Sequence, residues 1–404
     1  MHLTHSTLIQ AAQQFGSPLY VYNLDLVKQR YQELFSHIKH PRLKILFAMK
    51  ANYNPTILKT LIGLGAGIDT VSIGEALLAQ ELGCTSANML YTANNVTLAE
   101  MKQVHERGLL TNIGAISTLE TFGRAFPGSE VCLRFNPEVV AGSHEKIQTG
   151  GKLTKFGLLF QDLPEVLEIV SRYNLKVIGL HKHTGSGISE TDKYLEAVNN
   201  LLQIATLQNF PHLKSLDFGG GFGVPYHPLD QRFDLSKFGE IIVELVTAHE
   251  KKIGRELELW FEPGRYLVCE AGYLVIEVNT IKNNRGRKIV GTDSGFPQLI
   301  RPVFYDAYHQ IENLSNPNGK PQTYDICGNI CETGDHFAKD REIPEIREGD
   351  LLAIQNAGAY CYAMGGIYNL RPMPAEVVHE QGELKLSRKA LTPETLISQI
   401  LGEC

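Results

Sequence analysis

The sequence predicts an α/β protein in which a (β/α)8 barrel, similar to a TIM barrel, is followed by a C-terminal all-β domain. The 404 residues are more than one hydrophobic core usually organises. From about residue 43, eight short apolar runs alternate with segments of helical period, which is typical of a barrel. After Arg265 the segments are β-like and separated by turn residues. A doubly wound parallel sheet is the competing architecture for the first part.

The predicted barrel domain spans residues 25–266. Its strands are KILFAMK, GIDTVS, NMLYTA, LLTNIGA, VCLRFN, VIGLHKH, SLDFGGG and LELWFEPG. Helical segments between them include GEALLAQELG, TLAEMKQVHERG, DLPEVLEIVSRY and SKFGEIIVELVTAHEKKIG. The span is close to the length of about 250 residues that this barrel typically needs.

The predicted β domain spans residues 267–404 together with residues 1–24. GYLVIEVNTIKNNRGRKIVGTDSG contains two strands around an Asn-Asn-Arg-Gly turn. TYDICGNICE, DLLAIQNAGAY and AEVVHEQGELKLS are further β-like segments, and we expect the early SPLYVYN to join them.

Composition favours a soluble cytoplasmic protein. Hydrophobic residues make up 43% of the chain and charged residues 20%, and no apolar run approaches the roughly 18 residues of a membrane span. The net charge of −6 argues against a nucleic-acid partner. The N-terminal segment shows no secretory signal, and the seven cysteines, without a CxxC pair, fit reduced thiols.

Lys50 ends the first predicted barrel strand, within ILFAMKANYNP. Catalytic groups collect at the C-terminal ends of barrel strands. A lysine in a barrel mouth of low dielectric has a lowered pKa and can form a Schiff base. Alternatively, its ammonium simply extends out of the mouth into water.

The motif HKHTGSG, residues 181–187, follows the sixth predicted strand. We expect only one of His181 and His183 to face a ligand, so a shared metal site is not predicted. Ser186, between two glycines, suits a loop that offers a hydroxyl and backbone N–H groups to a phosphate. An ordinary Gly-Ser turn is the alternative.

Two further motifs follow the last two barrel strands. In DFGGGFG, Gly219, Gly220 and Gly221 let backbone amides approach an anion, and such barrels often bind phosphate at this place. In FEPGR, Arg265 can bind an anion while Glu262 can hold a cation or a protonated nitrogen. A tight turn and a surface ion pair are the alternatives.

Together these groups match pyridoxal phosphate. A lysine would hold the aldehyde, a histidine would stack on the ring, and the glycines and serine would bind the phosphate. A carboxylate at the pyridine nitrogen would keep the ring protonated, which makes it a strong electron acceptor.

At these residues the chain resembles the fold-type III pyridoxal-phosphate decarboxylases, the group that acts on ornithine, arginine and diaminopimelate. The resemblance runs from about Leu19 to Val378. Its markers are FAMKAN, RFNPEVVAGSHEKIQTGGKLTKFG, GLHKHTGS, DFGGGFG, EPGR, LIRPVFYDAYH, ICGNICETGDHFAKDREIP and NAGAYCYAMGGIYNLRPMPAEV. The family's fold, a barrel with a C-terminal β domain, agrees with the prediction above.

The resemblance implies a role for each matching residue. The catalytic residues would be the Schiff-base lysine Lys50, the ring-stacking His183 and Cys331 as the acid that reprotonates the substrate carbon. The cofactor-binding residues would be Lys50, His183, Ser186, Gly219, Gly220, Gly221, Glu262, Gly264, Arg265 and Tyr360. The substrate-binding residues would be Arg265, Arg301, Tyr305, Glu332 and Tyr360. No metal is implied.

The implied reaction is decarboxylation of meso-2,6-diaminopimelate to L-lysine and CO₂, in a homodimer whose Cys331–Glu332 loop reaches the neighbouring active site. Alternatives are a sibling decarboxylase for another basic or carboxylated amino acid, a racemase and a non-catalytic pyridoxal-phosphate carrier. The chain departs from the family pattern at Lys182, Ile73, Pro297 and Gly365–Gly366. These departures bear on substrate choice and remove no cofactor group.

Overall fold

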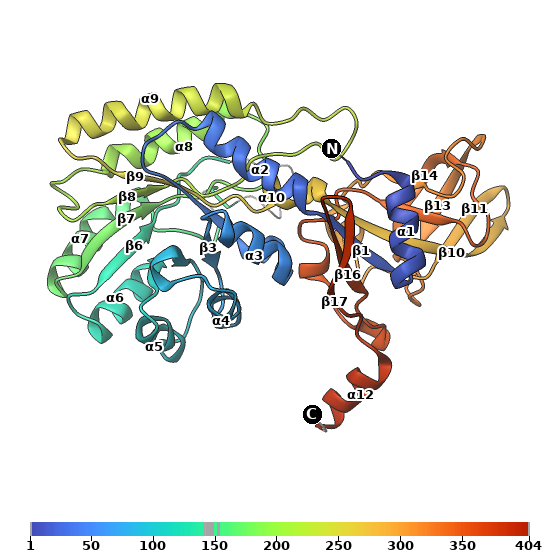
Figure 1. Cartoon of the computed structure of the whole chain (residues 1–404). Helices are drawn as coiled ribbons and strands as arrows, with labels where there is room; N and C mark the ends of the chain where they lie inside the picture. Colours follow the sequence, from blue (N-terminus) through green and yellow to red (C-terminus); the bar gives the residue numbers. More distant parts are fainter. Residues whose placement is uncertain (1, 141, 143–148, 152–153, 403–404) are drawn as a thin grey trace.

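The computed structural model consists of a closed barrel and a separate β sheet that lie side by side (Figure 1). It describes residues 2–140, 142, 149–151 and 154–402. The eight barrel strands run parallel, from β2 to β9 in chain order, and strand β9 closes the barrel on β2. Both parts of the predicted fold are therefore confirmed, and the doubly wound sheet is excluded.

All eight predicted barrel strands form, and each is shorter than predicted. The strands are β2 (Leu43–Ala48), β3 (Gly67–Thr70), β4 (Met89–Tyr91), β5 (Leu110–Ile113), β6 (Glu130–Arg134), β7 (Lys176–His181), β8 (Ser215–Asp217) and β9 (Glu258–Phe261). The surrounding helices are α2 (Leu24–His37), α3 (Pro55–Gly63), α4 (Ile73–Glu81), α5 (Leu98–Glu106), α6 (Ile116–Ala125), α7 (Leu163–Arg172), α8 (Thr191–Ile204) and α9 (Leu235–Ile253). Short 3₁₀ turns are η1 (Met49–Ala51), η2 (Ser86–Asn88) and η4 (Phe160–Asp162).

Local sequence explains where the barrel helices begin and end. Helix α3 starts where the Asn54 side chain accepts hydrogen bonds from Thr56 N–H and Ile57 N–H, with Pro55 in the first turn. Helix α9 starts at the N-cap Asp234 and ends at Gly254, which adopts the left-handed conformation.

The interior of the barrel is apolar at one level and polar above it. Leu46, Leu90, Cys132 and Trp260, from four strands, form one buried cluster. Nearer the C-terminal ends of the strands, charged and polar side chains are buried instead: Asp69, Arg134, His181, Asp217 and Glu262. Buried polar groups cost free energy unless they are paired, so this layer marks the functional end of the barrel.

The second body is a nine-stranded sheet with the path β14-β13-β11-β10-β1-β16-β17, and β12 and β15 attach beside it. Its strands are β1 (Leu19–Asn23), β10 (Gly272–Asn284), β11 (Arg287–Thr292), β12 (Ile311–Asn313), β13 (Pro321–Cys327), β14 (His336–Pro344), β15 (Leu351–Ile354), β16 (Ala375–Glu380) and β17 (Glu383–Arg388). The helical elements are α1 (His5–Phe15), α10 (Arg265–Val268), η5 (Cys269–Ala271), α11 (Arg301–Tyr305), η6 (Tyr362–Met364), η7 (Tyr368–Leu370) and α12 (Pro393–Leu401).

The N-terminal segment belongs to this sheet, as expected from SPLYVYN. Strand β1 pairs with β10 in antiparallel and with β16 in parallel orientation. The predicted turn between β10 and β11 is also present, because Asn284 pairs with Arg287 and the two loop residues, Arg285 and Gly286, both have positive φ. This is the conformation of a type I′ hairpin turn.

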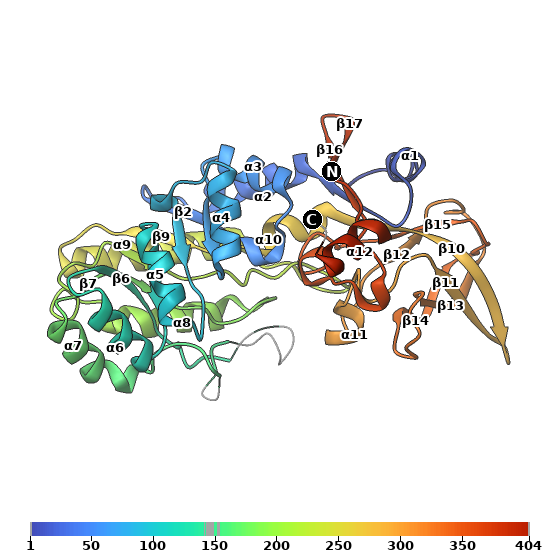
Figure 2. The same ribbon diagram turned by 90° about the horizontal axis from the view of Figure 1, so that it is seen from below.

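The chain passes from the barrel to the β sheet through a short helical segment. Between the last barrel strand and β10 lie only α10 and η5, close to α2 in both views (Figures 1 and 2), and the predicted boundary at residue 266 stays a prediction.

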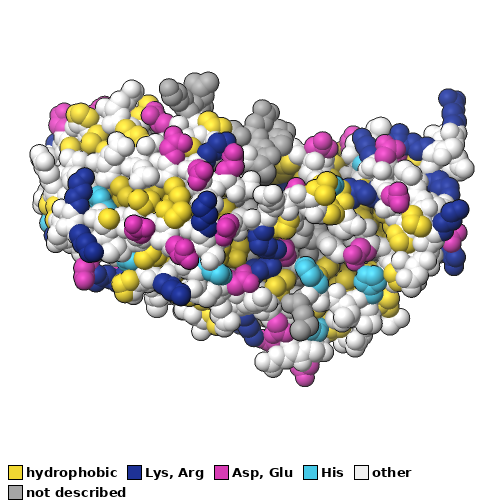
Figure 3. Space-filling view, turned by 90° about the horizontal axis from the view of Figure 1, so that it is seen from above, with side chains coloured by type: hydrophobic (Ala, Val, Ile, Leu, Met, Phe, Trp, Pro, Cys, Tyr) yellow, Lys and Arg dark blue, Asp and Glu magenta, His cyan; other side chains and the backbone are white. Residues whose placement is uncertain are grey.

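On one face, basic and acidic side chains are interspersed without a large patch of one sign (Figure 3). Within the described residues, no helix has the length and apolarity that a membrane crossing requires.

Candidate active site

Lys50 lies just beyond strand β2, in the 3₁₀ turn η1, and not in the strand itself. Its Nζ donates a hydrogen bond to Asp69 Oδ2 at 2.6 Å, and the Asp69 side chain is completely buried. Burial disfavours the ammonium, but the carboxylates of Asp69 and Glu262 outweigh it and raise the pKa of Lys50. The expectation of a lowered pKa is therefore wrong for this state of the protein, because a buried carboxylate sits beside the lysine.

His183 packs against the glycine loop that follows strand β8. Gly220 N–H donates to His183 Nδ1 at 3.2 Å. Gly219 has φ +65°, and a Cβ there would lie 2.6 Å from the same Nδ1 atom. A Cβ at Gly220 would lie 2.1 Å from Glu262 O, and one at Gly221, with φ +103°, would lie 2.5 Å from a neighbouring carbonyl oxygen. The loop can approach the histidine and strand β9 this closely only without side chains.

Glu262 follows strand β9, and its carboxylate is buried in the barrel mouth. Its Oε2 atom lies 3.1 Å from His181 Nε2, while its Oε1 atom has no hydrogen-bond partner among the described residues. Burial and then the nearby Arg134 hold the pKa of His181 well below its ordinary value, so the ring is neutral and Nε2–H donates.

Both histidines of the HKH motif face the barrel mouth, because side chains two positions apart in an extended segment point the same way. His183 lines the cavity and His181 contacts Glu262. Of the two, only His183 lines the cavity, so the expectation that one of them faces a ligand stays a prediction.

Arg265 contacts the serine loop, Tyr226 and Tyr360. Its Nε and Nη2 atoms each donate to Ser186 Oγ at 3.1 Å, and its Nη1 atom donates to the Tyr226 hydroxyl at 2.5 Å. The Tyr360 ring centroid lies 4.9 Å from the guanidinium carbon, and Tyr360 N–H donates to Ala51 O beside Lys50.

One cavity brings most of the predicted cofactor-binding residues together. Its lining includes Lys50, His183, Ser186, Gly221, Glu262, Gly264, Arg265 and Tyr360. Gly219 and Gly220 are absent from this lining, and they support it through their contacts with His183 and Glu262.

A larger groove adjoins this cavity, and Arg265 lines both. Arg301 and Tyr305, both predicted to bind substrate, line the groove. Arg301 is buried, and its Nε donates to His309 Nε2 at 3.4 Å. Burial, and then the charge of Arg301, lowers the pKa of His309 to about 3, so this imidazole is a neutral acceptor.

Neither Arg265 nor Arg301 is paired with a carboxylate of the described residues. In the part of the chain that the structure describes, no ion pair involves either guanidinium, although both side chains are buried. Their contacts are neutral groups: a serine, a histidine and the Tyr226 ring between them. Two buried cations without a counter-ion favour an anionic ligand.

Cys331 and Glu332 are not brought to this cavity within one chain. Both are exposed, and neither lines the cavity or the groove. Asn369 Nδ2 lies 3.3 Å from Cys331 Sγ, and the Tyr368 hydroxyl donates to Glu332 Oε1 at 2.7 Å. The two residues therefore form a separate exposed loop.

The sequence of the barrel shows to which protein family the chain belongs. Residues 24–269 match the family described as pyridoxal-dependent decarboxylase, pyridoxal binding domain. The chain belongs to the pyridoxal-dependent decarboxylases.

Individual relatives cover almost the whole of this decarboxylase. It is 38% identical to diaminopimelate decarboxylase of Methanothermobacter thermautotrophicus, over 96% of this chain and 92% of the relative. It is 36% identical to the diaminopimelate decarboxylase of Aquifex aeolicus, over 95% and 91%. The crystal structure of diaminopimelate decarboxylase from Helicobacter pylori complexed with L-lysine superposes with a TM-score of 0.89 at 29% identity, covering 98% of this chain and 99% of that one.

The cavity of this decarboxylase fits pyridoxal 5′-phosphate, the cofactor of its family. Glu262 Oε1 is a buried acceptor without a donor, as a protonated pyridine nitrogen requires. The glycines leave space that a Cβ would fill. The Lys50 side chain remains 38% exposed, so its amine is accessible from the cavity.

Sequence reasoning missed several residues of the decarboxylase site: Asp69, Arg134, Asp217, Tyr226 and His309. Three of them carried a signal, because each is a charged residue within or at the end of a predicted barrel strand: GIDTVS, VCLRFN and SLDFGGG. A buried charge in a barrel strand must be paired or functional. Tyr226 and His309 lie outside the strands and carried no comparable signal.

Two departures from the family pattern lie against each other. Gly366 N–H donates to Pro297 O at 2.8 Å, and Met364 Sδ lies 4.0 Å from the Tyr305 hydroxyl. The altered segments therefore form one unit that reaches a groove residue. Part of the marker RFNPEVVAGSHEKIQTGGKLTKFG, at positions 141, 143–148 and 152–153, lies outside the described residues.

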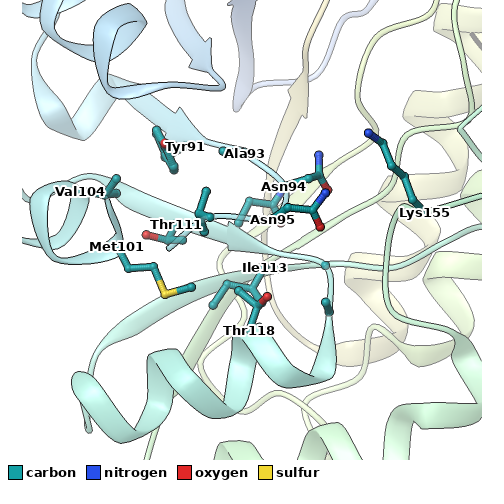
Figure 4. A pocket seen from close by; sticks show the side chains of 14 residues that line it. Tyr91, Ala93, Asn94, Asn95, Met101, Val104, Thr111, Ile113, Thr118 and Lys155 are labelled. Atoms are coloured by element: carbon teal, nitrogen blue, oxygen red, sulfur yellow. The ribbon is translucent and has the colours of Figure 1, made fainter. Parts of the chain in front are cut away.

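Another pocket of the decarboxylase lies at the C-terminal ends of β4 and β5. Asn94 and Asn95 lie side by side with Lys155 across from them, and Met101 and Val104 come from α5 (Figure 4). It shares no lining residue with the cavity or the groove, so it is not part of the site described above.

Proposed function

We propose that this decarboxylase removes one α-carboxylate of meso-2,6-diaminopimelate and releases L-lysine and CO₂, a step of lysine biosynthesis. The observation that carries the proposal is the buried Arg265 and Arg301 beside the cavity, without carboxylate partners among the described residues. A substrate with a second, distal carboxylate would supply the missing anion. The names of the relatives, and the L-lysine in one related structure, support this choice.

Most residues of the cavity would hold the cofactor. Lys50 would bind its aldehyde, His183 would stack on its ring, and Glu262 would accept from its pyridine nitrogen. The phosphate and ring edge would be held by Ser186, Gly219, Gly220, Gly221, Gly264, Arg265 and Tyr360. When bound, pyridoxal phosphate supplies a ring that accepts the electron pair of the breaking bond between the α-carbon and its carboxylate.

Asp69 would accept a proton from the Lys50 ammonium. An ammonium cannot bond to an aldehyde, so Nζ must first lose a proton. Asp69 Oδ2, at 2.6 Å, is placed to accept it. Burial, and then the charge of Glu262, raises the pKa of Asp69 and so makes it a better base than an ordinary aspartate.

The groove would hold the far end of the substrate. Arg301 and Arg265 would bind the distal carboxylate, and Tyr305 and Tyr360 would flank the bound chain. Discrimination follows from burial, because a substrate without this carboxylate would leave two buried cations unpaired.

We infer that the active enzyme is a homodimer in which Cys331 of the partner subunit protonates the substrate carbon and Glu332 of the partner subunit binds the distal amino group. Two observations support this. In one chain both residues are remote from the cavity, and exposed apolar side chains accompany them: Ile367, Tyr368 and Leu370. We also infer a cytoplasmic location without a nucleic-acid partner, in line with six free cysteines among the described residues and the net charge of −6.

A sibling decarboxylase is the second candidate, favoured by the altered unit of Pro297, Gly365 and Gly366 near Tyr305. The two candidates differ in substrate. CO₂ release should be measured with meso- and LL-diaminopimelate, lysine, ornithine and arginine, and the product identified by mass spectrometry. We expect turnover of the meso isomer to lysine. Turnover of another acid without the meso isomer would favour the sibling.

Borohydride trapping tests the assignment of Lys50. Reduction of the holoenzyme should attach the cofactor to the peptide that contains Lys50, and Lys50→Ala should lose both this adduct and CO₂ release. Lys44→Ala provides a matched control, because Lys44 lies in β2 but stacks on Trp260, away from the cavity. Retained turnover in Lys50→Ala would contradict the assignment.

A further inference from the structure

Beneath Glu262 lies a buried cluster that the proposed reaction has not yet used. His181, Asp217 and Glu262 each offer an oxygen or nitrogen atom, and these atoms lie within 4.8 Å of one another. All three side chains are buried. Asp217 is the last residue of β8, and its Oδ1 accepts from Gly219 N–H at 2.8 Å, so it also fixes the glycine loop.

The cluster cannot hold two ionised carboxylates at this distance in a buried site without raising their proton affinity. Burial, and then the charge of Glu262, raises the pKa of Asp217 well above its ordinary value. For Glu262, burial also raises the pKa, but the charges of Lys50 and Arg134 oppose it. A single proton shared by the pair therefore stays on Asp217, whose Oδ2 has no other partner among the described residues.

Glu262 then has two neighbours that can donate to it. His181 Nε2–H donates to Oε2 at 3.1 Å, and an oxygen of the protonated Asp217 carboxyl lies within 4.8 Å of the Glu262 carboxylate. The Oε1 atom has no hydrogen-bond partner among the described residues. Donors to a carboxylate stabilise its charged form and lower its basicity.

We propose that His181 and Asp217 are positioning residues that keep Glu262 ionised, so that the proton between Glu262 and the pyridine nitrogen of the cofactor stays on the nitrogen. This inference rests on the proposed role of Glu262. Without the two donors, Glu262 becomes the stronger base and takes that proton. The other charged or titratable groups that face the cluster are Lys50, Asp69, Cys132, Arg134, Lys182, His183 and Tyr194.

The test is the ¹⁵N chemical shift of the ring nitrogen in holoenzyme loaded with ¹⁵N-labelled pyridoxal phosphate, which reports protonation independently of activity. We expect wild type, His181→Gln and Asp217→Asn to share one protonated signal, because both amides still donate to Glu262. His181→Leu and Asp217→Leu should shift the signal toward the unprotonated position. His249→Leu removes a different buried histidine, bonded to Ala205 O, and should leave the signal unchanged.

The outcomes separate the inference from the role on which it rests. An unchanged signal in Glu262→Gln contradicts the role of Glu262. A changed signal in Glu262→Gln together with unchanged signals in both leucine variants contradicts the positioning role of His181 and Asp217 and leaves the role of Glu262 intact. If a leucine variant loses the cofactor, Asp217→Asn tests whether Asp217 is protonated. An unchanged ¹⁵N signal supports a protonated Asp217. A shifted signal contradicts the proposal, because an amide then replaces an ionised carboxylate. A stoichiometric divalent metal ion in the holoenzyme, found by elemental analysis, would also overturn the proposal.

Discussion

Lys182 departs from the family pattern at a position that does not line the cofactor cavity. Its side chain is completely buried between the barrel and α8, with Nζ 3.4 Å from Thr184 Oγ1 and 3.5 Å from the centroid of the Tyr194 ring. It has no carboxylate partner in the described part of the chain. Burial lowers the pKa of Lys182 well below the ordinary 10.5. The residue therefore costs stability.

We predict that Lys182→Met stabilises the protein by about 1–3 kcal/mol at pH 7, the cost of a buried and poorly paired polar group. The unfolded lysine keeps its proton up to its ordinary pKa, whereas the folded one loses it at lower pH, so wild-type stability rises with pH between these two values. The advantage of Lys182→Met should therefore shrink as pH rises toward 10.5. Denaturant unfolding of the holoenzyme at several pH values measures this.

Lys59→Met is the matched control, because Lys59 is an exposed residue of α3. It should change stability little at any pH. A destabilised Lys182→Met protein would show that the buried amine makes a net favourable contact, and it would contradict the prediction.

Arg301 is the residue at which substrate identity is decided in the proposal. We predict that Arg301→Gln lowers kcat/KM for meso-diaminopimelate by about 10- to 100-fold, the effect of losing a charge-assisted hydrogen bond of roughly 1.5–3 kcal/mol. Borohydride trapping of the cofactor should be unchanged, because Arg301 does not line the cofactor cavity. Arg287→Gln, at an exposed arginine paired with Asp325, is the control. Equal loss of trapping and turnover would contradict a role limited to substrate.

At the scale of residues, the sequence predicted which side chains line the site but not how their neighbours shift their pKa values. Lys50 was found because it follows a barrel strand, yet the direction of its pKa was wrong. The deciding neighbour, Asp69, is on the next strand and meets Lys50 only after the barrel closes. The role of His181 also depends on a distant residue, because its partner Glu262 lies far along the chain. Contacts between residues of different strands depend on the tertiary structure, so the sequence pattern of one strand does not predict them.

The glycine loop after β8 is the element that joins the cofactor site to the barrel. Gly219 and Gly254 have nearly the same positive φ, +65° and +70°, but their surroundings differ. A Cβ at Gly219 would meet His183 Nδ1 and Lys182 O, whereas a Cβ at Gly254 would meet nothing within 4 Å.

We predict that Gly219→Ala weakens pyridoxal-phosphate binding at least tenfold, whereas Gly254→Ala leaves it unchanged. Both variants should share a backbone strain of roughly 1–2 kcal/mol, because alanine disfavours the left-handed conformation. The difference between them isolates the displacement of His183. Cofactor titration monitored by fluorescence, alongside thermal unfolding, measures both effects. Equal cofactor affinities in the two variants would show that the loop tolerates a side chain.

At the scale of elements, the sequence predicted most of the framework because the apolar runs and the turn residues are local signals. All eight barrel strands, the β10–β11 turn and the joining of β1 were predicted. The end of β2 was not, because Met49–Ala51 is as apolar as the strand but turns into a 3₁₀ helix beneath Tyr360. The short helix α11 was also missed, since its five residues show no helical period.

On the scale of the whole molecule, the exposed loop of Cys331 and Glu332 is the feature that one chain does not explain. Helix α12 also stands away from the body (Figure 1), with Ile397, Ile400 and Leu401 each at least half exposed. Exposed apolar side chains of this kind are typical of interaction surfaces. Both observations support the proposed homodimer, in which each cavity is completed by the partner.

Shared sites predict complementation between two inactive variants. Lys50→Ala and Cys331→Ala homodimers should both be nearly inactive, for different reasons. In a mixed dimer, one site carries both changes and the other carries neither, because each site combines Lys50 of one chain with Cys331 of the other. Unfolding and refolding an equal mixture should therefore restore roughly a quarter of wild-type activity, since half of the dimers are mixed and each has one intact site. A mixture of Lys50→Ala with Glu262→Gln is the control, because both residues lie in the same cavity of one chain and no intact site can form. Activity that stays absent in the first mixture, although mass spectrometry shows mixed dimers, would place Cys331 outside the shared site.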